Sequence, residues 1–378
     1  MLPLEGIRVV DFGRVLSAPY GTMQLADLGA DVVKIEHPDY GDDTRSFGPP
    51  FVRDVSTYFV SINRGKRSIA LDLKKPEDIA LVKQLIAVSD VVVENFRPGV
   101  MKKLGLGYAE LSQDNPGLVY CSLSGYGQAH PDKPGYDLMM QGLSGIPSIT
   151  GPVDGEPFKC GASIADLIAG QNVVQGILAA LFRRERTGKG GLVDVSMMDG
   201  MLSLLTYHAS ALVNGGQDPK RRGNGHPSIH PFQPYACSDG YLTICVGNDR
   251  LFASLAKALE HPEWAEDVRF ATNVQRVAHR DLIDELIEPI FRSKTKLAWR
   301  EILQQHGVPA DIVATVPEAL EQATWAEHQH PDGQSTVKSL VGSYRLDGEL
   351  PIAPRRPPAL GEHREDVVAD WLQGVQKR

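Results

Sequence analysis

Over the first 120 residues, short runs rich in β-branched and apolar residues alternate with helix-like segments. The runs that indicate strands or helices are residues 7–12, 20–28, 31–36, 68–73, 76–88, 91–96 and 118–123. Strands that alternate with helices in this way are typical of a parallel sheet covered by helices. The pattern therefore predicts an α/β fold for this part of the chain.

A longer helix is predicted to begin at or just before Asp166. Leu167 and later apolar residues recur at near-helical spacing, and a cluster of cations followed by Gly188 makes a conventional stop. Ser163 and Asp166 match the Ser-x-x-acid pattern of a helix N-terminus. Such a position stabilises a negative charge by about 0.3 to 1 kcal/mol, so we expect the Asp166 carboxylate to stay ionised. It could serve as a nucleophile, although acidic residues also begin helices that have no catalytic role.

The composition changes after residue 213, where a polar, Gly-rich stretch over 214–225 predicts a linker. It separates a large domain over 1–213 from a smaller α+β domain over 226–319. The further elements that we expect are a strand over 241–246 and helices over 251–259, 281–291 and 364–372.

Composition and charge exclude several partners. The chain has 378 residues, enough for two domains, and a net charge of -8, which argues against binding nucleic acid or an anionic membrane. Its most apolar stretch, 173–182, is too short for a bilayer, which needs about 20 residues. Residues 1–6 lack the basic and apolar pattern of a leader, and the four cysteines show no metal-ligand spacing. We therefore expect a cytoplasmic protein with reduced thiols.

Two nucleotide-binding motifs are incomplete in this chain. Gly13 follows the first strand and Glu36 lies about twenty residues further on, as in NAD-binding domains. The second and third glycines of that fingerprint, however, are replaced by Val15 and Ala18. A phosphate-binding loop fails as well, because residues 188–190 read Gly-Lys-Gly and close a helix instead of opening one.

Hydrolytic and metal chemistry are less well supported. Ser163 lies in a near match to the G-x-S-x-G motif of serine hydrolases, but the last glycine is missing. Two close histidine pairs, His226 with His230 and His328 with His330, lack a third ligand at a recognisable spacing. We therefore expect no metal site, while a hydrolase built on Ser163 remains an alternative.

A carboxylate nucleophile fits the remaining chemistry. Its attack on a thioester forms a mixed anhydride, which preserves the acyl-transfer potential, so that CoA can pass to another acid. The nucleophile is already ionised and needs no general base. It does need a dry pocket and donors for the developing oxyanion.

Six motifs spread along the chain resemble those of the class III CoA-transferases, the CaiB/BaiF family. They are LEGIRVVD (4–11), LGADVVKIE (28–36), NRGKRS (63–68), ENFRPG (94–99), RTGKG (186–190) and PALGEH (358–363). The resemblance implies that Asp166 is the catalytic aspartate. It also implies a Rossmann-like large domain to which residues 320–378 return, a smaller domain between the two parts, and an interlocked homodimer.

The resemblance further implies that a CoA thioester is the substrate and that no cofactor is bound permanently. Positions similar to the family's CoA contacts are Val15, His37, Leu71, Lys74, Asn95, Phe96, Arg97, Lys103 and Tyr136. Three of them, Lys74, Arg97 and Lys103, carry the positive charge that phosphates require.

α-Methylacyl-CoA racemases resemble the chain over the same regions and are the main alternative. They move a proton with the histidine of a Gly-His-Asp motif, where this chain has Gly135, Tyr136 and Asp137. A tyrosine, with a pKa near about 10, is a poor substitute for that histidine, which favours a transferase. Segments 41–49, 225–227 and 247–249 are most similar to members acting on small dicarboxylates such as succinate, oxalate or hydroxymethylglutarate. The expected reaction moves CoA between an acyl-CoA and such an acid, through an aspartyl mixed anhydride and an aspartyl-CoA thioester.

Overall fold

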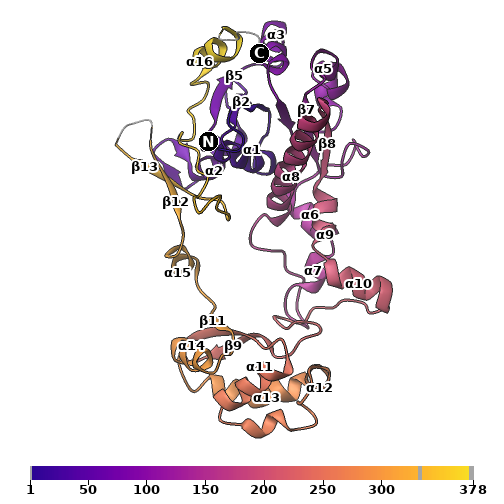
Figure 1. Ribbon diagram of the computed structural model, residues 1–378, viewed down its shortest axis with the longest axis vertical. Coiled ribbons are helices and arrows are strands. Elements are labelled where there is room, and N and C mark those ends of the chain that lie inside the picture. Colours follow the sequence, from indigo (N-terminus) through magenta and orange to yellow (C-terminus); the bar gives the residue numbers. More distant parts are fainter. Residues whose placement is uncertain (1, 331–333, 374–378) are drawn as a thin grey trace. The chain divides into compact units, whose positions relative to one another are not determined.

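The structure, a computed structural model, describes residues 2–330 and 334–373, which form two compact units (Figure 1). The first unit takes the described residues of Met1–Ile146, Lys159–Ala209 and Thr324–Arg378. The second takes Pro147–Phe158 and Ser210–Ala323. Segments from both ends of the chain therefore belong to one unit.

A six-stranded sheet in the order β5-β2-β1-β6-β7-β8 forms the centre of the first unit, and all neighbouring strands in it are parallel. Its strands are β1 Arg8–Asp11, β2 Asp31–Glu36, β5 Arg67–Ala70, β6 Val91–Glu94, β7 Val119–Ser124 and β8 Gly191–Ser196. The predicted α/β fold with a parallel sheet is confirmed. The edge strand β8 escaped prediction because the short run Leu-Val-Asp-Val includes an acid and follows the end of a helix directly.

The other elements of the first unit are short except for one helix. Its helices are α1 Ser17–Asp27, α2 Thr57–Ile62, α3 Pro76–Ala87, α4 Val100–Lys103, α5 Tyr108–Asp114, α6 Asp137–Leu143, α8 Ile164–Thr187, α9 Met197–Ser203 and α16 Arg364–Val368. Two small hairpins pair β3 Phe51–Val52 with β4 Val55–Ser56 and β12 Trp325–Gln329 with β13 Thr336–Leu340. Helices α7 Ile146–Ile149 and α10 Thr206–Gly215 cross the boundaries between the units.

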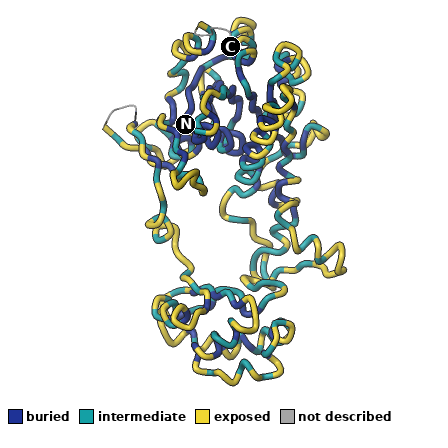
Figure 2. The backbone as a smooth tube through the Cα atoms, viewed as in Figure 1, coloured by how far each residue is buried: buried dark blue, intermediate teal, exposed yellow. Residues whose placement is uncertain are grey.

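Helices cover both faces of the sheet, so its central strands are buried on both sides (Figure 2). Val9 and Val93 pack with α1 and α8 in one apolar cluster. Val10 and Val92, which point to the opposite face, pack with α3, α5 and Trp371 in another. Because successive strand residues point to opposite faces, nearly continuous runs of valine suit this three-layer arrangement.

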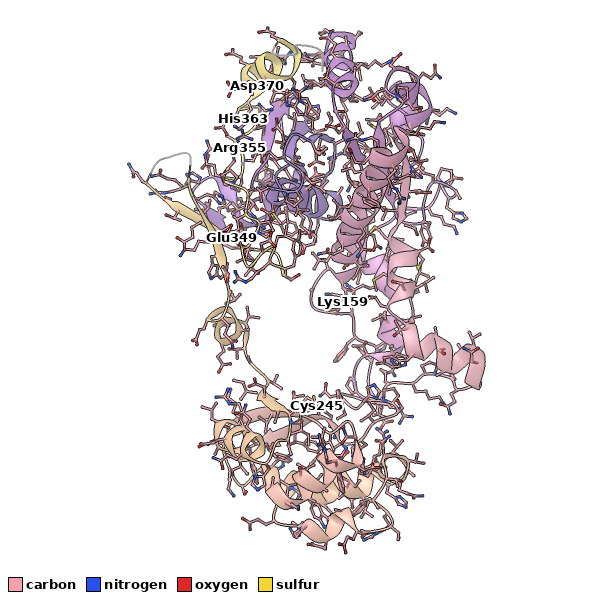
Figure 3. All side chains as sticks on the ribbon, viewed as in Figure 1. Lys159, Cys245, Glu349, Arg355, His363 and Asp370 are labelled. Carbon is pink, nitrogen blue, oxygen red and sulfur yellow. The ribbon has the colours of Figure 1, made fainter. Side chains whose placement is uncertain are left out.

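Polar contacts hold the C-terminal segment, in which Figure 3 labels His363 and Asp370, against the edge strand β5. His363 Nδ1 accepts the Ser68 N–H at 3.3 Å, and Arg67 Nη1 donates to Asp370 at 2.8 Å. The Trp371 indole N–H donates to Asp31 on β2 at 2.8 Å. Through these contacts the last described residues pack against the sheet that is formed by the N-terminal part of the chain.

The second unit is built around a three-stranded antiparallel sheet in the order β11-β10-β9. Its elements are β9 Phe232–Cys237, β10 Gly240–Cys245, α11 Asp249–Ala258, α12 Asn273–Ala278, α13 Arg280–Phe291, α14 Lys296–Gln305, β11 Ala310–Ile312 and α15 Val316–Leu320. The strand predicted over 241–246 and the helices predicted over 251–259 and 281–291 are confirmed to within about two residues at each end.

Helices α1 and α8 cross with almost no side chain between them. A Cβ atom placed on Gly170 would lie 2.7 Å from the Ser17 carbonyl oxygen, and one on Gly21 would lie 2.8 Å from the Gly170 carbonyl oxygen. Two glycines therefore allow the backbones to touch. Gly170 lies one helical turn beyond Asp166, so the same crossing places Ser17 beside that carboxylate.

Helix α8 has the length and apolar composition of a membrane-spanning helix, the one such helix among the described residues. That observation is weak, because the core helix of a soluble protein has the same properties. Val173, Ile177 and Leu181 of α8 are buried against the sheet and α1. The stretch expected to be too short for a bilayer is thus part of a longer helix, one face of which packs against the sheet and α1.

We predict that Gly170→Ala forces α1 and α8 apart, because the added methyl group meets backbone instead of a movable side chain. The free energy of unfolding should fall by about 1 to 3 kcal/mol. Urea unfolding followed by circular dichroism measures this change. Gly142→Ala is a matched control, since nothing lies within 4 Å of a Cβ there. Equal stability of the two variants would contradict the close crossing.

Candidate active site

Two neighbouring pockets lie at the carboxyl ends of β1 and β6. The chain runs from β1 outward to β2 and β5 on one side and to β6, β7 and β8 on the other. Ligands of parallel α/β sheets bind at such a switch point. The Asp166 pocket is lined by Arg14, Val15, Ser17, Asp43, Asn95, Phe96, Arg97, Pro98, Leu123, Ser124, Gly125, Lys133, Pro134, Gly135, Tyr136, Asp137, Asp166 and Met197.

Asp166 lies in the first turn of α8, as predicted, and Ser163 is the N-cap residue, but the Ser163 side chain accepts no capping hydrogen bond. The Asp137 carboxylate provides the cap instead, since its Oδ1 accepts the Ala165 N–H at 2.9 Å. Gln141, which is fully buried, donates to Asp137 Oδ2 at 2.8 Å and accepts the Cys160 N–H at 2.8 Å. The predicted Ser-x-x-acid cap is therefore wrong, because a carboxylate distant in sequence takes the site of the serine hydroxyl.

Burial is the main influence on the Asp166 carboxyl. Burial and the negative charge of Asp137 raise the pKa of Asp166, a hydrogen bond from Ser17 lowers it, and the result is a pKa of about 6. These effects outweigh the helix N-terminus, which alone favours the anion. At pH 7 about nine molecules in ten still carry the carboxylate. The group thus remains ionised but is more basic than an ordinary aspartate.

Tyr58 on α2 is a residue of this site that sequence reasoning missed. Burial raises the pKa of its phenol, and the charges of Asp166, Asp137 and Asp42 raise it further. The phenol therefore stays protonated and can donate a hydrogen bond near the aspartate. No motif marks Tyr58, and only the packing of α2 brings it into the field of Asp137 and Asp166, which lie far from it in the sequence.

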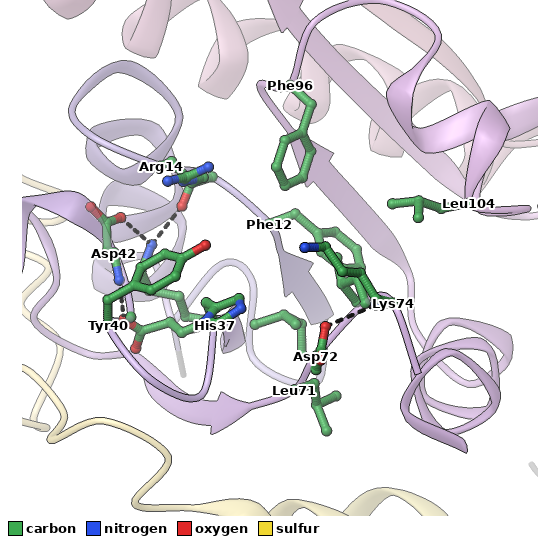
Figure 4. A pocket seen from close by; sticks show the side chains of 16 residues that line it. Phe12, Arg14, His37, Tyr40, Asp42, Leu71, Asp72, Lys74, Phe96 and Leu104 are labelled. Atoms are coloured by element: carbon green, nitrogen blue, oxygen red, sulfur yellow. Dashed lines mark hydrogen bonds and ion pairs between the residues drawn. The ribbon is translucent and has the colours of Figure 1, made fainter. Parts of the chain in front are cut away.

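The His37 pocket combines apolar side chains with polar groups at its rim (Figure 4). Its lining residues are Phe12, Gly13, Arg14, Lys34, Ile35, Glu36, His37, Tyr40, Gly41, Asp42, Leu71, Asp72, Leu73, Lys74, Phe96 and Leu104. The rings of His37 and Tyr40 stack with centroids 3.9 Å apart. Such a pair offers a flat aromatic surface, and Lys74 at the rim offers a positive charge. Tyr40 was not predicted.

A buried network of charges supports the loop between the pockets. Lys34 Nζ donates to the Gly13 carbonyl at 2.5 Å and pairs with Asp42 Oδ2 at 2.8 Å. Burial raises the pKa of Asp42, but the Lys34 charge outweighs it and holds this pKa at about 2. Asp42 Oδ1 accepts the N–H of Val15, which has a positive φ of 64°. Because this conformation is strained for a β-branched residue, the network must hold it in place.

The residues predicted to contact CoA are largely brought together. Val15, Asn95, Phe96, Arg97 and Tyr136 line the Asp166 pocket, while His37, Leu71, Lys74 and Phe96 line the His37 pocket. Lys103 lies exposed at the end of α4, and its neighbour Leu104 lines the His37 pocket. Arg14 and Phe96 belong to both linings, so the two pockets adjoin.

The alternative sites lack comparable geometry. Among the described residues no group of three histidine, cysteine or acidic side chains could hold a metal ion. His230 is buried beside Asp284, with Nε2 3.2 Å from Oδ1, and His328 Nε2 lies 3.0 Å from the Ala353 carbonyl. Ser163 is absent from both pocket linings given above.

Comparison with known proteins gives a consistent result. The family described as "CoA-transferase family III" matches residues 4–364. The chain is 38% identical to "Succinyl-CoA:glutarate CoA-transferase" of Mus musculus over 99% of its own length and 87% of the relative. It is 43% identical to "Acetyl-CoA:oxalate CoA-transferase" of Acetobacter aceti over 84% and 82%. A crystal structure of a CAIB/BAIF family protein from Brucella suis superimposes with a TM-score of 0.85 at 39% identity, covering 98% of this chain and 99% of the other.

We predict that Asp166→Asn stabilises the protein above pH 6. A pKa raised from 3.8 to about 6 means that the folded state binds the proton more tightly than the unfolded chain. Stability is therefore lost as the pH rises from about 4 to 6, by up to about 3 kcal/mol. The variant avoids this loss, so it should exceed the wild type in urea unfolding at pH 7.5 and match it near pH 4.

Asp281→Asn is the control, because Asp281 is an exposed acid in the first turn of α13. Its replacement should leave stability unchanged or lower it slightly at pH 7.5. If Asp166→Asn lowered stability at pH 7.5 as well, the carboxylate would not be strained by burial.

Proposed function

The chain belongs to CoA-transferase family III and is a CoA-transferase, and from this premise we propose that it moves CoA between an acyl-CoA and a small dicarboxylic acid, with Asp166 as the nucleophile. One observation carries the assignment. The ionised, half-buried carboxylate lies in one pocket with Val15, Asn95 and Arg97, three of the positions expected to contact CoA.

The proposed reaction alternates between two covalent forms of Asp166. The carboxylate attacks the thioester carbonyl, the C–S bond breaks, and a mixed anhydride and the CoA thiolate result. The thiolate attacks the aspartyl carbonyl and releases the first acid as its carboxylate, which leaves an aspartyl-CoA thioester. The acceptor carboxylate then attacks this thioester to form a second anhydride. Return of the thiolate to the acceptor acyl carbon yields the new acyl-CoA and free Asp166.

The environment of Asp166 suits each of these steps. Partial burial limits the access of water, which would hydrolyse the anhydride. A raised pKa makes the carboxylate more nucleophilic without removing its charge at pH 7. The protonated Tyr58 phenol is a candidate donor to the developing oxyanion.

The adjoining pockets suggest how CoA lies. The stacked rings of His37 and Tyr40 suit the adenine, and Lys74 and Arg97 suit the phosphates. The pantetheine arm then passes Phe96, which lines both pockets, toward Asp166. Lys103 remains a proposed phosphate contact at the exposed end of α4.

The names of the relatives support the choice of acid. They act on glutarate, on oxalate, and in a relative from Chloroflexus aurantiacus on D-citramalate. All three acids carry two carboxylates. We therefore propose a small dicarboxylate as the acceptor.

We also propose that the CoA thioester is a substrate and that no cofactor is bound permanently. A cytoplasmic location is supported by four free cysteines, two of them only half-buried, which suit a reducing compartment.

We predict that Asp166→Ala lowers the transfer rate by about 10³-fold or more while the dissociation constant of CoA changes little, because the bond-forming atom is lost but the pocket remains. Incubation of the wild type with succinyl-CoA and then hydroxylamine should convert Asp166 to a hydroxamate that is visible in peptide mass spectrometry. Asp199→Ala, an exposed first-turn acid on α9, should behave as the wild type. An unmodified Asp166 peptide would argue strongly against the nucleophile.

The racemase and hydrolase alternatives make different predictions. A transferase exchanges CoA between succinyl-CoA and a free acid in heavy water without placing deuterium at the α-carbon, and nuclear magnetic resonance measures both events. Deuterium uptake without transfer would support a racemase. Steady release of CoA with no acceptor acid, abolished by Ser163→Ala, would support a hydrolase.

An interlocked homodimer is the proposed assembly. Large apolar side chains are exposed on α6, α9 and α10, where a monomer would leave them in water: Leu138, Leu143, Leu202, Tyr207, Leu212 and Val213. Burial of such side chains between two chains would stabilise the folded state.

We predict a dimer by light scattering at every accessible dilution, and a midpoint of unfolding that rises with protein concentration, as for obligate dimers. A folded and active monomer would exclude the interlocked assembly. It would not affect the assignment of Asp166, because both pockets are formed within one unit of a single chain.

A further inference from the structure

Glu94, the last residue of β6, is a buried carboxyl that the proposed reaction does not use. Only about 4% of the residue is exposed. Among the described residues it has no ion-pair partner, and it accepts hydrogen bonds from Ser122 on β7 and from the Phe96 backbone. Burying a carboxylate without a cation beside it costs folding free energy, so the position of Glu94 needs a physical reason.

The contact with Phe96 shapes the segment that follows. Glu94 Oε2 accepts the Phe96 N–H at 2.9 Å, which bends the chain as it leaves the sheet. Within this bend the Asn95 side chain turns back, accepts the Arg14 N–H at 2.8 Å and donates to the Arg14 carbonyl at 2.9 Å. Phe96 and Arg97 then line the pockets. One carboxylate oxygen thus supports three residues expected to contact CoA.

The other carboxylate oxygen is occupied as well. Ser122 donates its hydroxyl hydrogen to Glu94 Oε1, and the Ser122 oxygen accepts from Gln128 Nε2 at 2.6 Å. Both oxygens of Glu94 therefore act as acceptors. A proton on Oε2 would collide with the Phe96 N–H, and a proton on Oε1 would require the Ser122 hydroxyl to turn away. In the first case the hydrogen bond from the Phe96 N–H is lost. In the second case this bond remains, but its acceptor is no longer charged and the bond is weaker.

We propose that Glu94 is a positioning residue for CoA: its carboxylate holds segment 95–97 in the shape that lines both pockets, and protonation of this carboxylate weakens CoA binding. The inference rests on the proposed function, because it assumes that these pockets hold CoA.

The surroundings place this protonation near neutral pH. Burial raises the pKa of Glu94, the hydrogen bonds from Ser122 and Phe96 lower it, and the Asp194 charge on β8 raises it, with a result of about 7. On β7, burial raises the pKa values of Tyr120 and Cys121, the Glu94 charge raises them further, and both groups stay protonated. On the other side, Asp11 of β1 is paired with Lys66 at 3.1 Å. No cation therefore opposes protonation of Glu94 among the described groups around it.

The test is calorimetric titration of the full-length chain with CoA between pH 5.5 and 8.5. Glu94→Gln keeps the shape and the acceptor for Phe96 but carries no charge. At pH 8 its dissociation constant should be about five-fold higher than that of the wild type, and near pH 6 the two should converge. In assays at pH 8 the KM for acyl-CoA should rise about as much, while kcat stays within about twofold. Glu110→Gln, which changes an exposed acid paired with Lys83 at 2.9 Å, is the matched control.

The Ser122→Ala variant shows whether Glu94 positions segment 95–97 through its charge or only supports the fold. It removes a hydrogen bond to the Glu94 carboxylate without touching Phe96, so the pKa of Glu94 should rise and the pH at which CoA binding weakens should move upward. An unmoved transition in this variant, or a wild-type pH profile in Glu94→Gln, would overturn the inference. So would a loss of kcat with unchanged KM. If the wild type transfers and binds CoA normally, such results leave the proposed function intact, whereas a wild type that binds no CoA would overturn both.

Discussion

Two buried lysines beneath the carboxyl end of β1 are the constraint on which both pockets depend. Lys34 pairs with Asp42 and holds the Gly13 carbonyl, while Lys66 pairs with Asp11 at 3.1 Å. Burial lowers the pKa of Lys66 to about 8, because the lysine ammonium group loses its hydration in this site. Removal of one partner from such a pair typically costs about 3 to 5 kcal/mol, because an unpaired charge remains inside. The loop after β1 is therefore rigid in a position that segment 95–97 and the aspartate pocket share.

The rigid loop explains how Val15 keeps a positive φ. A β-branched residue in that conformation is strained by about 1 to 3 kcal/mol, and the Asp42 acceptor helps to maintain it. The strained turn brings the backbone between the two pockets, next to Arg14 and Ser17. Strain at such a point is common where a ligand must approach the backbone closely.

Asp166, the proposed nucleophile, also lies in a position that lowers the stability of the fold. Asp166 is close to a second carboxylate, Asp137, which repels it and at the same time caps its helix. Burial adds to the repulsion, and the Ser17 hydroxyl relieves part of it. The contact of α1 with α8 at Gly21 and Gly170 brings Ser17 there. Packing of two helices thus tunes the basicity of one side chain, and Glu94 shows a comparable coupling between a buried carboxyl and the shape of a loop.

The sequence by itself determined the parallel α/β sheet, because strands buried on both faces need continuous apolar runs, and it placed Asp166 in the first turn of a helix. Through the family resemblance it also indicated part of the pocket lining, including Asn95, Phe96 and Arg97. Only the tertiary structure decided that Asp137 and not the Ser163 side chain caps α8, that the charge of Asp166 acts on Tyr58, and that Tyr40 stacks on His37. Local patterns record hydrogen bonds and periodicity between near neighbours. Contacts between distant segments, and the burial that shifts a pKa, exist only once the layers have packed.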